Sequence, residues 1–158
     1  MSDQQQLWDM LDDFHVCMAT THDGGTLRSR PMVPRIDRDA GVIRFLTEGG
    51  AHKVREVEAD HDINLAFAEP RKMEFVSLSG TANISHDRAQ VKALWNAYAD
   101  AWFDGGPEDA DVAVVTVRPT QAELWNGESN KIRTIWEIAK ATSGSGHPDL
   151  GENRKVKL

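Results

Sequence analysis

Short alternating segments joined by tight turns constrain the fold of this chain more than any other feature of its sequence. Residues 14–20 alternate apolar and polar side chains as a half-buried strand does, and HDGG at residues 22–25 is a strong hairpin turn. Segments 28–36 and 42–47 are also typical of strands, with the turn DRDAG at residues 37–41 between them. Strands joined by such short turns pair antiparallel, so residues 14–47 are predicted to form a three-stranded meander.

Two prolines interrupt the second of these strands. Pro31 and Pro34 have no N–H group to donate to a ladder, so they predict an edge strand, a bulge, or a backbone turned toward a ligand. Further strands are predicted, in chain order, at residues 63–68, 75–84, 112–117 and 121–125.

Helices are predicted between pairs of strands, at the periphery of the fold. Helical spacing of apolar residues indicates a first helix at residues 3–13 and a short one after Gly50. Asp87 can cap a longer helix with one apolar face, formed by Val91, Leu94, Trp95, Tyr98 and Trp102. A last helix is predicted at residues 132–141.

The order of these elements predicts a mainly β domain of the α+β type, an antiparallel barrel with peripheral helices. A doubly wound parallel sheet would need a helix after nearly every strand. The length of 158 residues suits one domain. We expect residues 1–142 to form it and residues 143–158 to form an extended, weakly ordered arm.

The bulk composition narrows the class of protein. A net charge of -7 argues against nucleic acid as the main partner, because DNA binding needs many cations on one face. No apolar run is long enough to span a membrane. The N-terminal residues lack the pattern of a signal peptide, and the single cysteine, Cys17, fits a reducing compartment. The expected location is the cytoplasm.

Common catalytic and metal-binding patterns are missing from the sequence. The six histidines form no pair at i, i+3 or i, i+4, so no metal site is predicted. Ser77 and Ser79 lack the G-x-S-x-G elbow, and there is no P-loop or dinucleotide fingerprint. Cys17 lies in an alternating strand, where a buried structural thiol is expected. These patterns assign no catalytic residue.

One group of basic residues indicates a small anionic ligand. Arg28, Arg30, Arg35 and Arg38 lie within eleven positions, and His52-Lys53 follow at the start of a predicted helix. Free N–H groups at a helix start, together with a lysine, suit a phosphate group. The alternative, which spacing alone leaves open, is that residues 52–55 are a solvated helix face.

Four segments resemble a known family in the same order along the chain. LRSRPM (27–32), FLTEGGAHKV (45–54), FVSLSG (75–80) and AELWNG (122–127) are similar to the general stress protein type of the pyridoxamine 5'-phosphate oxidase-like family. The resemblance implies a six-stranded antiparallel split β-barrel. It also implies a homodimer with FMN bound at the subunit interface.

The resemblance also implies which residues hold the flavin. They are Arg30, Pro31, Met32, Arg35, Leu46, Thr47, His52, Lys53 and Trp125. Pro31 and Met32 would lie along the isoalloxazine ring, and His52 and Lys53 would hold the phosphate. Trp125 would reach the flavin from the other subunit. Without the resemblance, Trp125 would be interpreted as an ordinary core aromatic.

Departures from the family pattern limit the predicted activity. The true oxidase follows its tryptophan with an R-L-H-x-R element, where this chain has KIRTI at residues 131–135, so oxidation of pyridoxamine phosphate is not expected. His52 replaces an arginine, which predicts weaker or pH-dependent phosphate binding. The leading hypothesis is an FMN-binding protein with oxidoreductase activity on an unknown small substrate, in a stress-related role. The alternatives are a non-catalytic flavin-binding or flavin-sequestering protein, or a family member that uses a deazaflavin coenzyme or haem.

Overall fold

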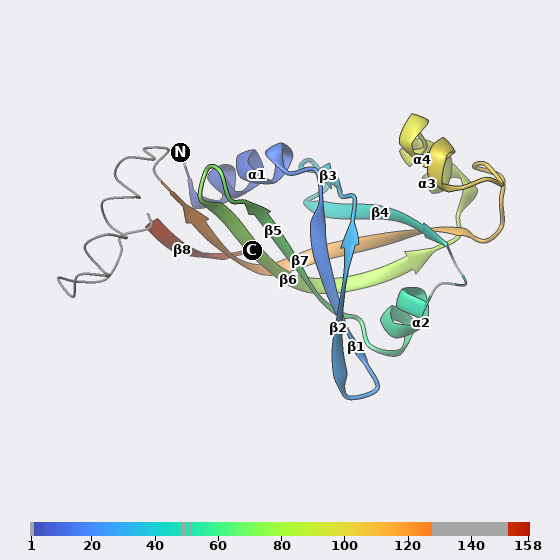
Figure 1. Ribbon diagram of the computed structural model, residues 1–158, viewed down its shortest axis with the longest axis horizontal. Helices are drawn as coiled ribbons and strands as arrows, with labels where there is room; N and C mark the ends of the chain where they lie inside the picture. The colour runs from blue at the N-terminus through green and yellow to red at the C-terminus, as the bar shows by residue number, and fades with distance from the viewer. Residues whose placement is uncertain (1, 49, 51, 128–151) are drawn as a thin grey trace.

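The computed structural model describes residues 2–48, 50, 52–127 and 152–158, with the backbone alone for residues 52–54, 59, 152 and 153 (Figure 1). These residues form a strongly curved antiparallel sheet with short helices around it. The elements are α1 (Asp3–Asp13), β1 (Cys17–Asp23), β2 (Thr26–Met32), β3 (Arg35–Asp37), β4 (Val42–Glu48), α2 (His52–Ala59), β5 (Asp62–Glu69), β6 (Glu74–Ser85), α3 (Arg88–Leu94), α4 (Ala97–Trp102), β7 (Val112–Asn126) and β8 (Glu152–Lys157).

The sheet has the strand order β2-β1-β5-β6-β7-β4-β3, and β8 pairs with β7. Strands β2 and β3 therefore lie at opposite edges of the sheet, although only Val33 and Pro34 separate them in the chain. The sheet curls until these edges meet, and Figure 1 shows β1 and β2 crossing in front of β4 and β7. The edges are joined covalently and not by a ladder of the described strands, so this is a split barrel whose sheet is not closed.

The predicted meander of residues 14–47 is wrong, and the prolines are the reason. Pro34 ends the predicted strand 28–36 in its middle, so β2 pairs with β1 while β3 pairs with β4. Pro31 lies on the edge strand β2. Because this strand has a neighbour on one side only, the missing N–H group of Pro31 costs no hydrogen bond to a second neighbouring strand. If β2 and β3 are counted as one interrupted strand, β1 to β7 give the six strands of the predicted barrel.

The core of the barrel lies on the inner face of this sheet. Its largest fully buried side chains include Phe45, Phe67, Leu65, Leu78 and Leu124. Helix α1 adds Leu7 and Leu11 to the same core. As predicted, α1 begins after Ser2, whose hydroxyl accepts the N–H of Gln5 in a capping box.

The long helix predicted after Asp87 is two short helices, α3 and α4. The side chain of Asn96 accepts the N–H of Ala99 and so begins a new helix in a different direction. Val91 and Ala99 are buried as a result, whereas Tyr98 and Trp102 are 45% and 65% exposed. The prediction of a single apolar face is therefore wrong for the C-terminal half of this segment, helix α4.

The two strands predicted at residues 112–117 and 121–125 form one continuous strand, β7. Its pairing with β6 shifts between Ser79 and Gly80, which lets the strand pass through Pro119. A Cβ atom at Gly80 would lie 2.2 Å from the carbonyl oxygen of Arg118, so this close approach requires glycine.

The C-terminal residues contain a strand that the sequence did not predict. Strand β8 pairs with Gln121–Asn126 of β7. The predicted helix 132–141 and residues 143–151 of the predicted arm lie outside the described residues. Among the helices that are described, none combines the length and the apolar character needed to cross a membrane.

Candidate functional site

A cavity of about 450 Å³ lies between β2, β3, the end of β4 and helix α4. Its walls include five of the nine predicted flavin-site residues: Pro31, Met32, Arg35, Leu46 and Thr47. Strands β2 and β4 are not hydrogen-bonded neighbours, so it is the curvature of the sheet that brings their residues to one cavity. Cavities of this size, with mostly apolar walls and few polar groups, are typical of small-molecule sites.

Thr47 is the most informative residue in this cavity. Its side chain is buried, 1% exposed, at the second-to-last residue of strand β4, before the connection to α2. Its Oγ1 atom has no hydrogen-bond partner among the described residues. Leaving a buried hydroxyl unpaired costs about 1–3 kcal/mol, so an unpaired hydroxyl at a residue of the cavity wall calls for an explanation.

Arg30, a predicted flavin-site residue, is not among the residues that line this cavity, and its side chain contacts helix α2. Its Nη2 atom donates to Oε2 of Glu56 over 2.5 Å, and its Nη1 atom donates to Oγ1 of Thr21 over 2.6 Å. Glu56 is only 5% exposed, so this ion pair is largely buried. Arg30 therefore joins the edge strand β2 to the helix that follows Thr47.

His52 and Lys53 are the first two residues of α2. The helix starts four residues after the end of β4, and its first N–H groups have no partner within the helix itself. The side chains of His52 and Lys53 lie outside the description. The backbone thus provides the helix start that the sequence predicted for a phosphate group.

The family of this chain follows from its match to a family model. The model of the pyridoxamine 5'-phosphate oxidase-like family matches residues 2–149. The chain belongs to this family. The resemblance inferred from four short segments is thereby confirmed, and so is the split-barrel fold.

Individual relatives extend this result to the general stress protein type. A general stress protein 26 from Jannaschia sp. CCS1 is 33% identical and superposes with a TM-score of 0.76 over 100% of both chains. The general stress FMN/FAD binding protein of Xanthomonas citri is 28% identical, with a TM-score of 0.71 over 80% of this chain and 90% of that one. Protein bli-3 of Neurospora crassa is 31% identical over 134 residues, or 78% of this chain, which spans 64% of the length of bli-3.

In this family member, Trp125 is not among the residues that line the cavity of its own chain. It is half-buried on β7, opposite Phe75 of β6 and Asn153 of β8. The cavity adjoins the other end of β7, where Val114 pairs with Leu46. Eleven positions of the curved strand β7 separate Val114 from Trp125.

Tyr98 and Trp102 of α4 line the cavity and were missed in the sequence as site residues. Their ring centroids lie 5.9 Å apart, and both side chains are exposed. Asn96 was the available signal, because asparagine is a strong helix cap and implies a new helix start. A planar ligand in the cavity would have an aromatic wall on the α4 side.

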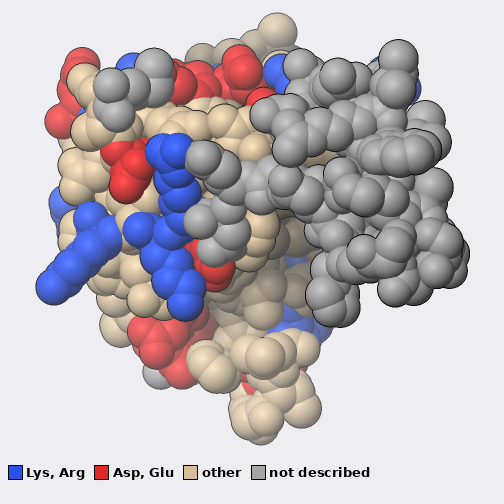
Figure 2. Space-filling model, turned by 90° about the vertical axis from the view of Figure 1, so that its left-hand side faces the viewer, with Lys and Arg blue, Asp and Glu red and all other residues tan. Residues whose placement is uncertain are grey.

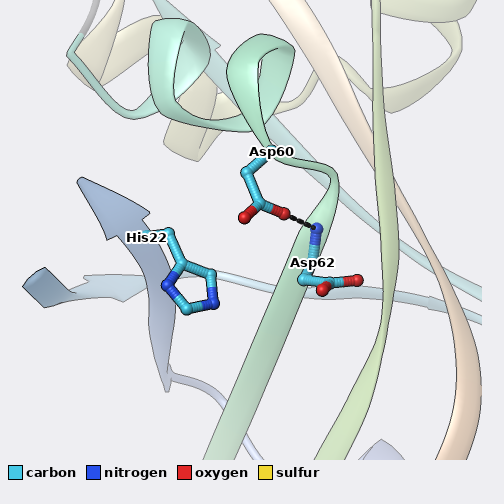
Figure 3. A group of neighbouring side chains, drawn as sticks. All are labelled: His22, Asp60 and Asp62. Atoms are coloured by element: carbon cyan, nitrogen blue, oxygen red, sulfur yellow. Dashed lines mark hydrogen bonds between the residues drawn. The ribbon is translucent and has the colours of Figure 1, made fainter. Parts of the chain in front are cut away.

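A separate group of potential metal ligands lies on the other side of β1. Figure 3 shows His22 facing Asp60 and Asp62, with potential ligand atoms all within 4.8 Å of one another. Sequence spacing missed the group because His22 lies in β1, Asp60 lies between α2 and β5, and Asp62 begins β5. Asp60 already accepts the backbone N–H of Asp62, and the side chains of His22 and Asp62 are exposed. The arrangement is that of a polar turn, and nothing else marks it as a metal site.

The single cysteine is buried, as predicted. Burial raises the pKa of the Cys17 thiol to about 12. The thiolate is the nucleophilic form of cysteine, so this environment disfavours it.

Surface charges of both signs alternate on the face that carries α1 and β8. Figure 2 shows blue Lys and Arg side chains on this face bordered by red acidic ones. Ion pairs of Arg154 with Asp3 and of Lys72 with Asp13 account for part of this pattern. The basic groups on this face are thus partly neutralised by neighbours.

Proposed function

We propose that the chain binds FMN in the cavity between β2, β4 and α4 and carries out oxidoreduction of a small substrate with it. The observation that carries the proposal is the unpaired, buried hydroxyl of Thr47 in a cavity lined by four other predicted flavin-site residues. Membership of the family and the FMN/FAD binding protein of Xanthomonas citri support a flavin as the ligand.

The residues of this chain have separate roles in the proposal. Pro31 and Met32 provide an apolar wall for the isoalloxazine ring, and Arg35 places a positive charge at its edge. Thr47 donates or accepts one hydrogen bond. The N–H groups at the start of α2, with His52 and Lys53, hold the phosphate.

When bound, the flavin supplies the hydride or electron transfer. The protein then needs to bind, orient and shield it, and no side chain has to act as a strong acid or base. The described residues that line the cavity fit this division, because the charged ones among them are Arg35 and Glu48. The general stress protein names of the relatives support a stress-related role.

We further propose that the working form is a homodimer in which Trp125 reaches the flavin of the other subunit. Trp125 is not among the residues that line the cavity of its own chain, which supports this arrangement. The exposed apolar side chains of Val16, Met18 and Leu27, on or next to the β1–β2 hairpin, provide surface that a second copy can cover.

The test is the chromophore. Protein purified without added cofactor is denatured, and the released chromophore is identified by its absorption spectrum and mass. FMN is the expected result, and added FMN should rebind with micromolar affinity or better, about -8 kcal/mol. A deazaflavin or haem would overturn the cofactor assignment. If FMN is released but the bound FMN is not turned over by any pair of reductant and acceptor that is tested, the result would instead favour a flavin-sequestering protein.

A further inference from the structure

Glu56 is a buried carboxylate on which three side chains of the β1–β2 hairpin converge. It lies in the middle of α2, and its side chain is 3% exposed. Thr21 comes from β1, and Arg28 and Arg30 come from β2. Neither the family match nor the sequence patterns assign a role to Glu56.

The contacts form a connected network. Thr21 Oγ1 donates to Oε2 of Glu56, which also accepts from Nη2 of Arg30 over 2.5 Å. Arg30 completes a triangle by donating to Thr21 Oγ1 over 2.6 Å. Arg28 Nη1 lies 3.5 Å from the other oxygen, Oε1. A buried charge needs such partners, and these link the helix to two strands.

Two neighbouring side chains of helix α2, Glu56 and Val57, are buried. The helix has eight residues, too few to be stable without tertiary packing. Val57 is its buried apolar side chain among those described, and Glu56 is its buried charged one. The buried part of the helix thus includes one apolar and one ionic contact at adjacent positions.

We propose that Glu56 is a positioning residue for anion binding. It locks α2 onto the β1–β2 hairpin and thereby holds the helix start at residues 52–53 toward the end of β4. It also orients Arg30, whose guanidinium donates both to Glu56 and to Thr21. The anion is the phosphate of FMN, so this inference rests on the proposed function.

The experiment compares Glu56→Gln with Glu58→Gln, a matched control that removes the same charge from an exposed position of the same helix. Amide hydrogen exchange is measured in the ligand-free proteins, and FMN and riboflavin are titrated into each. Glu56→Gln should speed exchange in residues 52–59 and weaken FMN binding about tenfold or more, with riboflavin changed less than about threefold. Glu58→Gln should change neither.

Each outcome decides a separate point. Unchanged exchange in α2 of Glu56→Gln overturns the anchoring role, whatever the flavins do. Equal weakening of FMN and riboflavin shows general support of the fold and overturns the positioning role. If wild-type protein binds both flavins equally, the phosphate site of the proposed function fails and Glu56 no longer positions an anion, while exchange still reports its anchoring.

A second variant covers the case in which Glu56→Gln does not fold. Thr21→Val removes one hydrogen bond to Glu56 and leaves every charge in place. It should give the same pattern at smaller amplitude: faster exchange in α2 and a loss of affinity for FMN that exceeds the loss for riboflavin. Exchange equal to wild type in this variant would contradict the network.

Discussion

Replacing Thr47 by valine should stabilise the empty protein and weaken flavin binding at the same time. The hydroxyl is buried and unpaired among the described residues, so its burial costs about 1–3 kcal/mol without a ligand. Valine has nearly the same shape and no polar atom. Thr47→Val should therefore raise the melting temperature of the empty protein by about 2–4 °C per kcal/mol recovered.

The same substitution removes a hydrogen bond to the ligand. A neutral hydrogen bond contributes about 0.5–1.5 kcal/mol, so FMN affinity should fall about 2- to 12-fold. Thr47→Ser keeps the hydroxyl and should keep most of the affinity. The assay combines thermal melts of empty and FMN-saturated protein with a titration of flavin fluorescence.

Thr21→Val is the control for Thr47→Val. The hydroxyl of Thr21 is also buried but is bonded to Glu56 and Arg30, so the same chemical change there should destabilise the empty protein. If Thr47→Val is destabilised as much as Thr21→Val, and binds FMN as wild type does, the hydroxyl of Thr47 has no part in the site.

Three further predictions follow from other parts of the structure. Lys53→Ala should lower FMN affinity about 10- to 150-fold, because it removes a charge-assisted contact of about 1.5–3 kcal/mol, and should leave riboflavin affinity unchanged. Equal losses for the two flavins in isothermal titration would contradict the phosphate assignment. Light scattering should show a dimer with an interface of about 2,000 Å² or more, and a monomer that retains FMN would contradict the proposed role of Trp125. Because burial raises the pKa of Cys17 from 9.0 to about 12, the folded protein holds a proton that the unfolded chain loses, so stability should fall as the pH rises from about 9 to 12. Cys17→Ala should flatten this fall in urea melts, and an unchanged slope would contradict the assignment.

Much of the fold could be predicted from local patterns. The errors arose where long-range geometry determines which strands pair. Helix α1 and strands β4, β5 and β6 match their predictions closely, because alternation and capping are local signals. The pairing of β2 depends on how far the sheet curls, which no local pattern records. The reversal at Asn96 was visible in the sequence, but the helical spacing of the surrounding apolar residues obscured it.

The candidate site was predicted in part. Pro31, Met32, Arg35, Leu46 and Thr47 line one cavity, as the family resemblance implies. The contribution of α4 was not predicted, since Tyr98 and Trp102 were assigned to a buried face. The ion pair of Arg30 with Glu56 was also missed, because the two residues are 26 positions apart and carry no spacing signal.

The proposed flavin site can be tested by a crystal structure of the chain with FMN. Density for the isoalloxazine ring is expected between Pro31, Met32 and α4, with Oγ1 of Thr47 within hydrogen-bond distance of the flavin. The phosphate is expected at the N–H groups of residues 52–53. Density for FMN at any other place, or an empty cavity at saturating FMN, would contradict the proposed site.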